Sequence, residues 1–134
     1  MPIVSISNNQ RQGLPTLSYV KTVYNSLAVS EYPFIEKPTG DYLLWIGRMS
    51  PKKGALEAIT IAKQCGIRLH MAAAIDPIDE PYFLSEIKPH IDGDHVVFHG
   101  ELSHQTIVSL YGNARAVLYP ISWHEPFGFS KNVS

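Results

Sequence analysis

From Tyr42 onward, short apolar runs alternate with segments of helical periodicity, and this alternation constrains the fold more than any other feature of the sequence. The apolar runs cover residues 42–46, 69–73, 95–99 and 116–121. They are nearly continuous, as strands buried on both faces of a sheet are. Strands that alternate with helices through short loops form a parallel sheet wound by right-handed crossovers. The sequence therefore predicts an α/β fold.

Three helices are expected between these strands. Residues 54–65 place small and apolar side chains along one side at helical spacing, and Gly66 provides a C-terminal stop. Cys65 is expected to be a small core residue on that side. Residues 80–91 form a second helix that Pro89 ends or kinks, and Ser103 caps a third helix that runs to about Asn113.

The first forty residues lack this strong periodicity. Residues 3–6 and 20–24 are short strand candidates, separated by the polar segment 7–13. Residues 30–41 contain Pro33, Pro38 and Gly40 and are typical of a linker. We therefore divide the chain into a crossover and linker segment, residues 1–40, and a ligand-binding domain, residues 41–134.

Charge and composition exclude several classes of protein. Eleven basic and 12 acidic residues give a net charge of −1, which argues against a general nucleic-acid binder. Cys65 is the only cysteine, so no intrachain disulfide can form and a reducing compartment is expected. No apolar run approaches the roughly 20 residues that cross a bilayer, and we expect a cytoplasmic protein.

The loop over residues 47–54 is the first candidate site, because ligands of such sheets bind beyond the carboxyl ends of the strands. Gly47 permits a sharp turn, and Arg48 can make paired hydrogen bonds to phosphate oxygens. Lys53 and Gly54 lie at a predicted helix N-terminus, which favours an anion. Taken alone, the segment is equally well explained as a solvated surface loop.

Two later segments lie at the same edge of the predicted sheet. Gly100 would let the backbone approach a flat ligand, although a plain strand-ending turn explains it at least as well. Glu125 is placed to accept hydrogen bonds from sugar hydroxyls, and amides near Gly128 to donate to phosphate or sugar oxygens. Phe127 either joins the core, the favoured alternative, or lines the pocket. The histidines are dispersed in the sequence, so no metal site is expected.

In order and spacing, these segments resemble the donor-binding half of family 4 glycosyltransferases, which are retaining enzymes of the two-domain GT-B architecture. The resemblance rests on Gly47-Arg48-x-x-Pro51-x-Lys53-Gly54, Gly100 and Glu125-Pro126-Phe127-Gly128, and reaches back to Ile6-Ser7 and Val23-Tyr24-Asn25-Ser26-Leu27. It implies a Rossmann-like doubly wound parallel sheet, the C-terminal half of a GT-B glycosyltransferase.

The resemblance also implies roles for individual residues. Arg48 and Lys53 would bind the donor diphosphate and stabilise the leaving group, while Glu125 would contact the donor sugar. The nucleotide base would lie near Gly100, Glu101 and Leu102. The donor would be a UDP- or GDP-linked sugar, with no further cofactor.

The sequence departs from this family at its C-terminal end. Val133 stands where the family has a second acid that holds the ribose, and the usual continuation is replaced by Lys131-Asn132-Val133-Ser134. The acceptor domain is also missing, so we expect a truncated, incomplete domain that binds a nucleotide-sugar and is inactive alone. It would be completed by a separate acceptor-domain chain or by a homodimer.

Two other classes of function are alternatives to this interpretation. The chain could be a non-catalytic interaction module completed by a partner, since an incomplete sheet exposes apolar surface. A dehydrogenase is disfavoured because no G-x-G-x-x-G follows the first strand, residues 42–46. A phosphate-receiver domain is disfavoured because no acidic cluster follows that strand.

Overall fold

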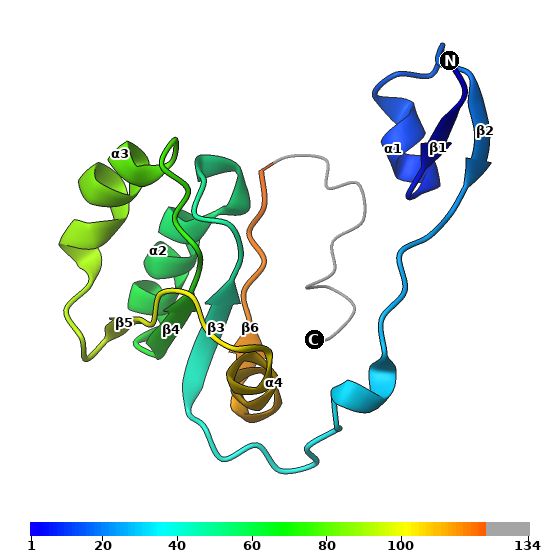
Figure 1. The fold of residues 1–134 in the computed structure, drawn as a ribbon. Coiled ribbons are helices and arrows are strands. Elements are labelled where there is room, and N and C mark those ends of the chain that lie inside the picture. Colours follow the sequence, from blue (N-terminus) through cyan, green and yellow to red (C-terminus); the bar gives the residue numbers. More distant parts are fainter. Residues whose placement is uncertain (123–134) are drawn as a thin grey trace.

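The computed structural model of the chain describes residues 1–122, which form two groups of secondary structure joined by a linker (Figure 1). The first group consists of β1 (Ile3–Ser5), α1 (Asn8–Gln12) and β2 (Tyr19–Thr22). The second group is built on a larger sheet of β3 (Tyr42–Ile46), β4 (Arg68–Ala72), β5 (Val96–Phe98) and β6 (Ala116–Val117). Its helical elements are η2 (Pro51–Lys53), α2 (Ala55–Cys65), α3 (Glu80–Tyr82), the π-helical η3 (Phe83–Ile87), η4 (Lys88–His90) and α4 (His104–Asn113).

The larger sheet is parallel throughout, with its strands in the order β5-β4-β3-β6. Leu43 of β3 pairs with Leu69 of β4 on one side and with Ala116 of β6 on the other. The chain thus moves outward from β3 through β4 to β5 and then returns to place β6 against the other edge of β3. This reversal confirms the predicted doubly wound parallel sheet.

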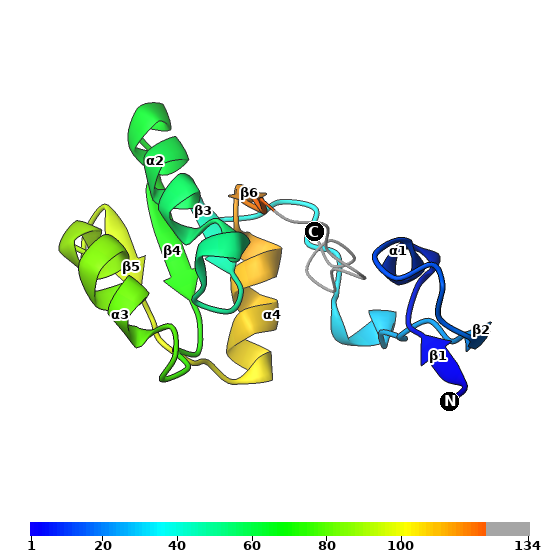
Figure 2. The same cartoon turned by 90° about the horizontal axis from the view of Figure 1, so that it is seen from above.

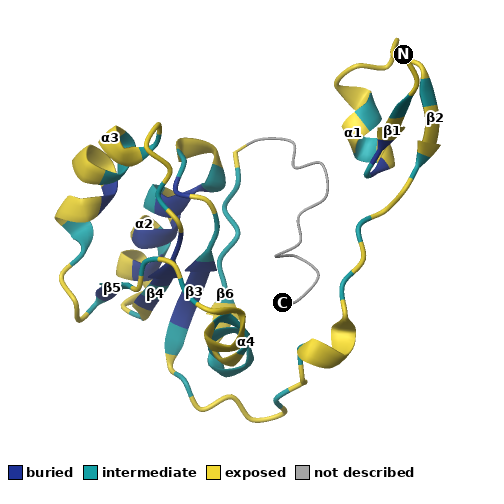
Figure 3. Cartoon of the chain, in the orientation of Figure 1, coloured by how far each residue is buried: buried dark blue, intermediate teal, exposed yellow. Residues whose placement is uncertain are grey.

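Helices cover both faces of this sheet. Successive strand residues point to opposite faces. Leu43 and Trp45 of β3 are buried in the core cluster that α2 completes. Tyr42 lies on the other face, where its hydroxyl donates to the carbonyl oxygen of Leu110 in α4 over 3.0 Å. Figure 3 shows the most buried residues concentrated in β3, β4 and the side of α2 that packs on them.

Helix α2 forms over the predicted residues, with one difference in its buried face. Ala55, Ala58, Ile59 and Ala62 are buried, as the periodicity indicates. Cys65 is exposed, so its assignment to the core was wrong. It is the last residue of the helix, one position before Gly66, whose positive φ of 64° turns the chain away.

Two other elements differ from their predicted form. The helix expected over residues 80–91 is built from α3, η3 and η4 in succession. Pro89 is the second residue of η4, and its ring is incompatible with a regular helical turn before it, which accounts for the wider π turn. The strand expected over residues 116–121 is also shorter. Leu118 still donates to the carbonyl of Leu44 over 2.8 Å, but Pro120 has no N–H to continue the ladder.

The N-terminal group is a small parallel strand–helix–strand unit. Strands β1 and β2 pair in parallel, and α1 connects them. Ser7 caps α1 by accepting a hydrogen bond from the amide of Gln10, whose own side chain accepts from the amide of Ile6. Figures 1 and 2 both show this unit set apart from the larger sheet.

The linker between the two groups contacts α4 along its length. Glu31 accepts a hydrogen bond from His104 over 3.1 Å, and the amide of Gly40 donates to the carbonyl of Asn113 over 3.1 Å. Between these ends, the side chain of Ile35 fills the space where Gly112 has no Cβ. Residues 31–40 are thus held to the same helix at both ends and in the middle.

Candidate functional site

The candidate site lies where the winding of the sheet reverses. Strands β3 and β6 are neighbours in the sheet but far apart in sequence, and their crossovers run in opposite directions from them. In open α/β sheets the loops that leave two such strands diverge to opposite faces and leave a crevice, where ligands bind. The loops that follow β3 and β6 therefore form the frame of the site.

The loop after β3 is the segment in which the sequence predicts phosphate binding. Met49 is fully buried and anchors its middle, and the 3₁₀ turn η2 leads to Gly54, the N-cap of α2. The indole Nε1 of Trp45 donates to the carbonyl oxygen of Lys53 over 3.1 Å. A buried side chain of the strand thus fixes the point at which the loop enters the helix. Lys53 and Gly54 lie at the N-terminus of α2, as the sequence predicts.

The segment after β6 lies directly against this loop. The amide of Ser122 donates to the carbonyl oxygen of Lys52 over 3.2 Å. A Cβ at Gly54 would collide with the carbonyl oxygen of Pro120, so only glycine permits this approach. Trp123 is the next residue in the sequence. The predicted site residues Glu125, Phe127 and Gly128 lie outside the described residues.

The two predicted phosphate-binding cations differ in environment. The side chain of Arg48 is 68% exposed, and its Nε lies 3.5 Å from Oδ2 of Asp76, in the loop after β4. An exposed pair of this length contributes little stability and can exchange its carboxylate for another anion. Lys53 is half-buried, and its Cβ lies 3.8 Å from the position that a Cβ on Gly47 would occupy.

A cavity of about 170 Å³ opens beside the loop, at the carboxyl ends of β3, β4 and β5. Gly47 lines it, together with the predicted base-binding residues Gly100, Glu101 and Leu102. Its remaining walls are small or aliphatic: Ile46, Ala72, Ala73, Ala74 and Ile107. Gly100 has a φ of 70°, and its carbonyl accepts from the amide of Ala73 over 3.0 Å. The structure therefore brings together two sequence segments that were predicted separately.

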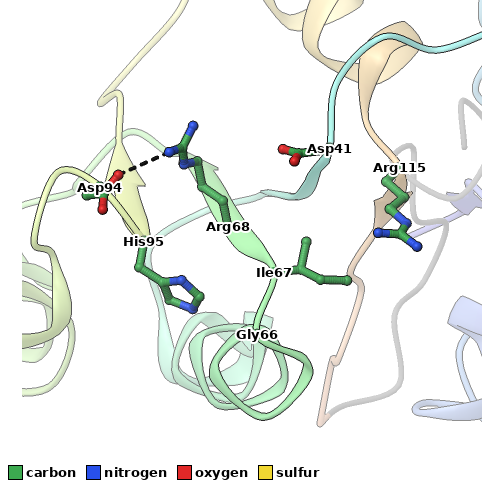
Figure 4. Close-up of a pocket in the computed structure, with 7 residues that line it drawn as sticks. All are labelled: Asp41, Gly66, Ile67, Arg68, Asp94, His95 and Arg115. Atoms are coloured by element: carbon green, nitrogen blue, oxygen red, sulfur yellow. Dashed lines mark hydrogen bonds and ion pairs between the residues drawn. The ribbon is translucent and has the colours of Figure 1, made fainter.

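A larger cavity of about 330 Å³ lies at the opposite, amino edge of the sheet (Figure 4). It is lined by Asp41, Gly66, Ile67, Arg68, Asp94, His95 and Arg115. Arg68 and Asp94, next to each other on one side of it, form an ion pair of 3.0 Å. Because the loops at this edge do not come from the carboxyl ends of the strands, we place the candidate site at the smaller cavity instead.

Some residues that contribute to the site were not predicted from the sequence. Asp76, the partner of Arg48, follows a buried strand, which was the available signal. Pro120 was expected inside a strand and Ser122 was not predicted, and only the strand order shows that they touch the loop after β3.

Among residues 1–122, no group of three His, Cys, Asp or Glu side chains is arranged to hold a metal ion. Within the same residues, no helix has the length and apolar character of a membrane span.

Comparison with known proteins gives matches among solved structures alone. No protein-family model and no curated protein matches the sequence. The crystal structure of AviGT4, a glycosyltransferase involved in avilamycin A biosynthesis, superimposes with a TM-score of 0.73 at 28% identity, over 94% of this chain and 39% of that one. A sucrose-phosphate synthase from Thermosynechococcus elongatus has a TM-score of 0.73 at 16% identity, over 96% and 37%. A glycosyltransferase from Rickettsia africae has a TM-score of 0.69 at 17% identity, over 96% and 40%.

The solved structures of this group are GT-B glycosyltransferases, and the chain spans about two-fifths of their length. At the lower identities the likeness is one of fold alone. The chain thus has the Rossmann-like α/β fold of a domain of a GT-B glycosyltransferase.

Proposed function

We propose that this chain is a donor-binding domain of the retaining, family 4 type, which binds a nucleoside-diphosphate sugar linked to UDP or GDP. One observation supports this function above the others. The basic loop after β3 and the segment after β6 touch at the reversal of the sheet, through the Ser122–Lys52 hydrogen bond and the approach of Pro120 to Gly54. The diphosphate would lie on this loop, at the N-terminus of α2.

The proposed chemistry is electrostatic stabilisation of the departing nucleoside diphosphate. As the glycosidic bond to phosphate breaks, negative charge grows on the diphosphate, and Arg48 and Lys53 would stabilise that charge. Arg48 would exchange its exposed contact with Asp76 for phosphate oxygens. Glu125 would accept hydrogen bonds from the donor sugar, with Phe127 and Gly128 beside it.

The base would occupy the cavity of about 170 Å³ between Gly47 and the turn at Gly100. Its small and aliphatic walls fit a flat ring, and the exposed Glu101 would give the rim a hydrogen-bond acceptor. We propose donor binding as the activity of this chain and expect no sugar transfer by the chain alone. Transfer requires donor and acceptor to be held together, and orientation supplies several kcal/mol of the barrier.

Calorimetric titration with UDP and GDP tests the binding proposal. Arg48→Ala and Lys53→Ala should each weaken nucleotide binding by about 1–3 kcal/mol, because a charged hydrogen bond is lost. Lys63→Ala is the matched control, since Lys63 carries the same charge on α2 but contacts His90 at the far end of that helix. The control should bind as the wild type does.

If UDP and GDP bind equally well to the wild type and to both loop variants, the diphosphate does not lie on this loop and the proposal is wrong. Sugar transfer by the purified chain would contradict the expectation of inactivity. An assay with radiolabelled UDP-glucose and a panel of acceptors would detect it.

A second candidate function, a non-catalytic interaction module, is favoured by the N-terminal unit. Val4 and Val20, on its paired strands, are 56% and 67% exposed, and Leu14 between them is 59% exposed. Apolar side chains gathered on so small a unit are typical of a surface that binds a partner. Light scattering distinguishes the two cases: mass that rises with concentration supports this function, and a constant monomer mass counts against it.

A further inference from the structure

Three aromatic side chains form a ladder across one face of the larger sheet, on the side of α4. Tyr42 of β3 stacks on His70 of β4 with ring centroids 4.3 Å apart and planes inclined by 23°. His70 in turn faces His99, which follows β5, at 5.0 Å between centroids. The Nε2 atom of His99 lies 3.0 Å from the Nδ1 atom of His70. Residues far apart in the sequence are thus brought to a nitrogen–nitrogen contact.

The backbone and the neighbouring side chains hold this contact in place. The amide of His99 donates to the carbonyl of Met71 over 2.9 Å, so both histidines are tied to β4. The ring of Tyr42 is fixed by its hydroxyl, which donates to the carbonyl of Leu110 over 3.0 Å. His70 therefore has a fixed aromatic surface on one side and the ring of His99 on the other.

The separation of the two nitrogens suits a shared metal ion. Two imidazole nitrogens bound to one tetrahedral Zn²⁺ at 2.0–2.1 Å are about 3.3 Å apart. The observed 3.0 Å would have to lengthen by only a few tenths of an ångström. A metal ion would then replace the proton between the two rings, and each ring would tilt so that its nitrogen lone pair points at the ion.

We propose that His70 and His99 form a two-histidine chelate for a divalent transition-metal ion, with Zn²⁺ as the probe of choice. Neutral imidazole is a preferred ligand of zinc, copper and nickel. His99 is exposed, so an ion reaches the pair from solvent, and water or another ligand completes the coordination. The site lies on a face of the sheet and does not involve the loop after β3.

Burial and the neighbouring charges favour the neutral form of His70. Burial lowers the pKa of His70 from its usual value, and the nearby His99 and Arg68 lower this pKa further. A histidine with a lowered pKa stays neutral at neutral pH, which is the state that binds metal. Arg68 also opposes the metal charge, but Asp94 pairs with Arg68 over 3.0 Å. Tyr42 remains protonated, because burial raises its pKa.

Calorimetric titration of the whole chain with ZnCl₂ at pH 7.5 tests the proposal. His70→Gln and His99→Gln should each weaken Zn²⁺ binding by about tenfold or more, since each leaves one ligand where the rigid sheet had placed two. His90→Gln is the matched control, because His90 contacts Lys63 elsewhere on the surface. Its affinity for Zn²⁺ should stay within about twofold of the wild type.

Imidazole ¹⁵N NMR spectra give a second readout on the same samples. Zn²⁺ should shift the resonances of His70 Nδ1 and His99 Nε2 and leave those of His90 in place. His99→Gln keeps the test decisive if His70→Gln fails to fold, because His99 is exposed. The proposal is overturned if the wild type takes up no Zn²⁺ at about 1 mM. It is overturned equally if His90→Gln weakens binding as much as His99→Gln does.

Discussion

Replacing Gly54 with alanine tests the contact between the loop after β3 and the segment after β6. Gly54 has a φ of 74°, and an alanine in this left-handed region costs about 1–2 kcal/mol. The new Cβ would also collide with the backbone carbonyl of Pro120, which cannot rotate away as a flexible side chain would. Overpacking of this kind costs about 1–3 kcal/mol, so the whole change should destabilise the fold by about 2–5 kcal/mol.

Gly66→Ala is the control that separates these two contributions. Gly66 has a similar φ of 64°, but a Cβ added there would meet nothing within 4 Å. Both substitutions restrict the unfolded chain equally, so that effect cancels in the comparison. Urea denaturation followed by circular dichroism should therefore show Gly54→Ala less stable than Gly66→Ala by about 1–3 kcal/mol. Equal losses would show that Pro120 does not press on Gly54, and the described frame of the site would be wrong.

Three further predictions concern the elements around the site. Ser103→Ala removes the cap that accepts from the amide of Thr106, and thermal or urea denaturation should show a loss of about 1 kcal/mol. Gly112→Ala would force Ile35 away from α4, so limited proteolysis should cut the linker faster than in the wild type. Hydrogen bonds from the amides of Val96, Asp94 and His95 lower the pKa of Asp92. The ionised carboxylate therefore stabilises the fold fully above the usual aspartate pKa. This stabilisation is lost as the pH falls through the lowered pKa. The stability difference between wild type and Asp92→Ala should accordingly shrink in denaturation curves recorded from about pH 5 downward, and a constant difference would contradict this assignment.

Local patterns in the sequence were sufficient for the strands and helices with a strong periodic signal. The apolar run at residues 42–46 forms β3 over the same residues, and Ser103 caps α4 as expected. Helix α1 was missed although its signal was present, since Ser7 followed by Gln10 is a capping pair at the start of a short polar helix. The five polar residues of α1 have no apolar face, so the segment lacks the periodicity that predicts a helix.

Features that depend on the packing of distant segments could not be derived from the sequence. The helical spacing placed Cys65 on the buried side of α2, but Cys65 is the last residue of that helix, directly before the turn at Gly66, and it is exposed. The contact between Ser122 and Lys52 requires the order of the strands, which the spacing of apolar runs does not contain. For the same reason, His70 and His99 looked dispersed until the pairing of β4 with β5 brought them together.

The contacts between the linker and α4 indicate which residues could act as a hinge between the N-terminal unit and the larger sheet. The last backbone hydrogen bond of the N-terminal unit runs from Val23 to Ser5, and the first one of the linker runs from Glu31 to Ala28. Residues 24–27 lie between these two anchors. Because residues 31–40 contact α4 at three points, we expect any rotation of the small unit relative to the larger sheet to occur through the backbone torsions of residues 24–27.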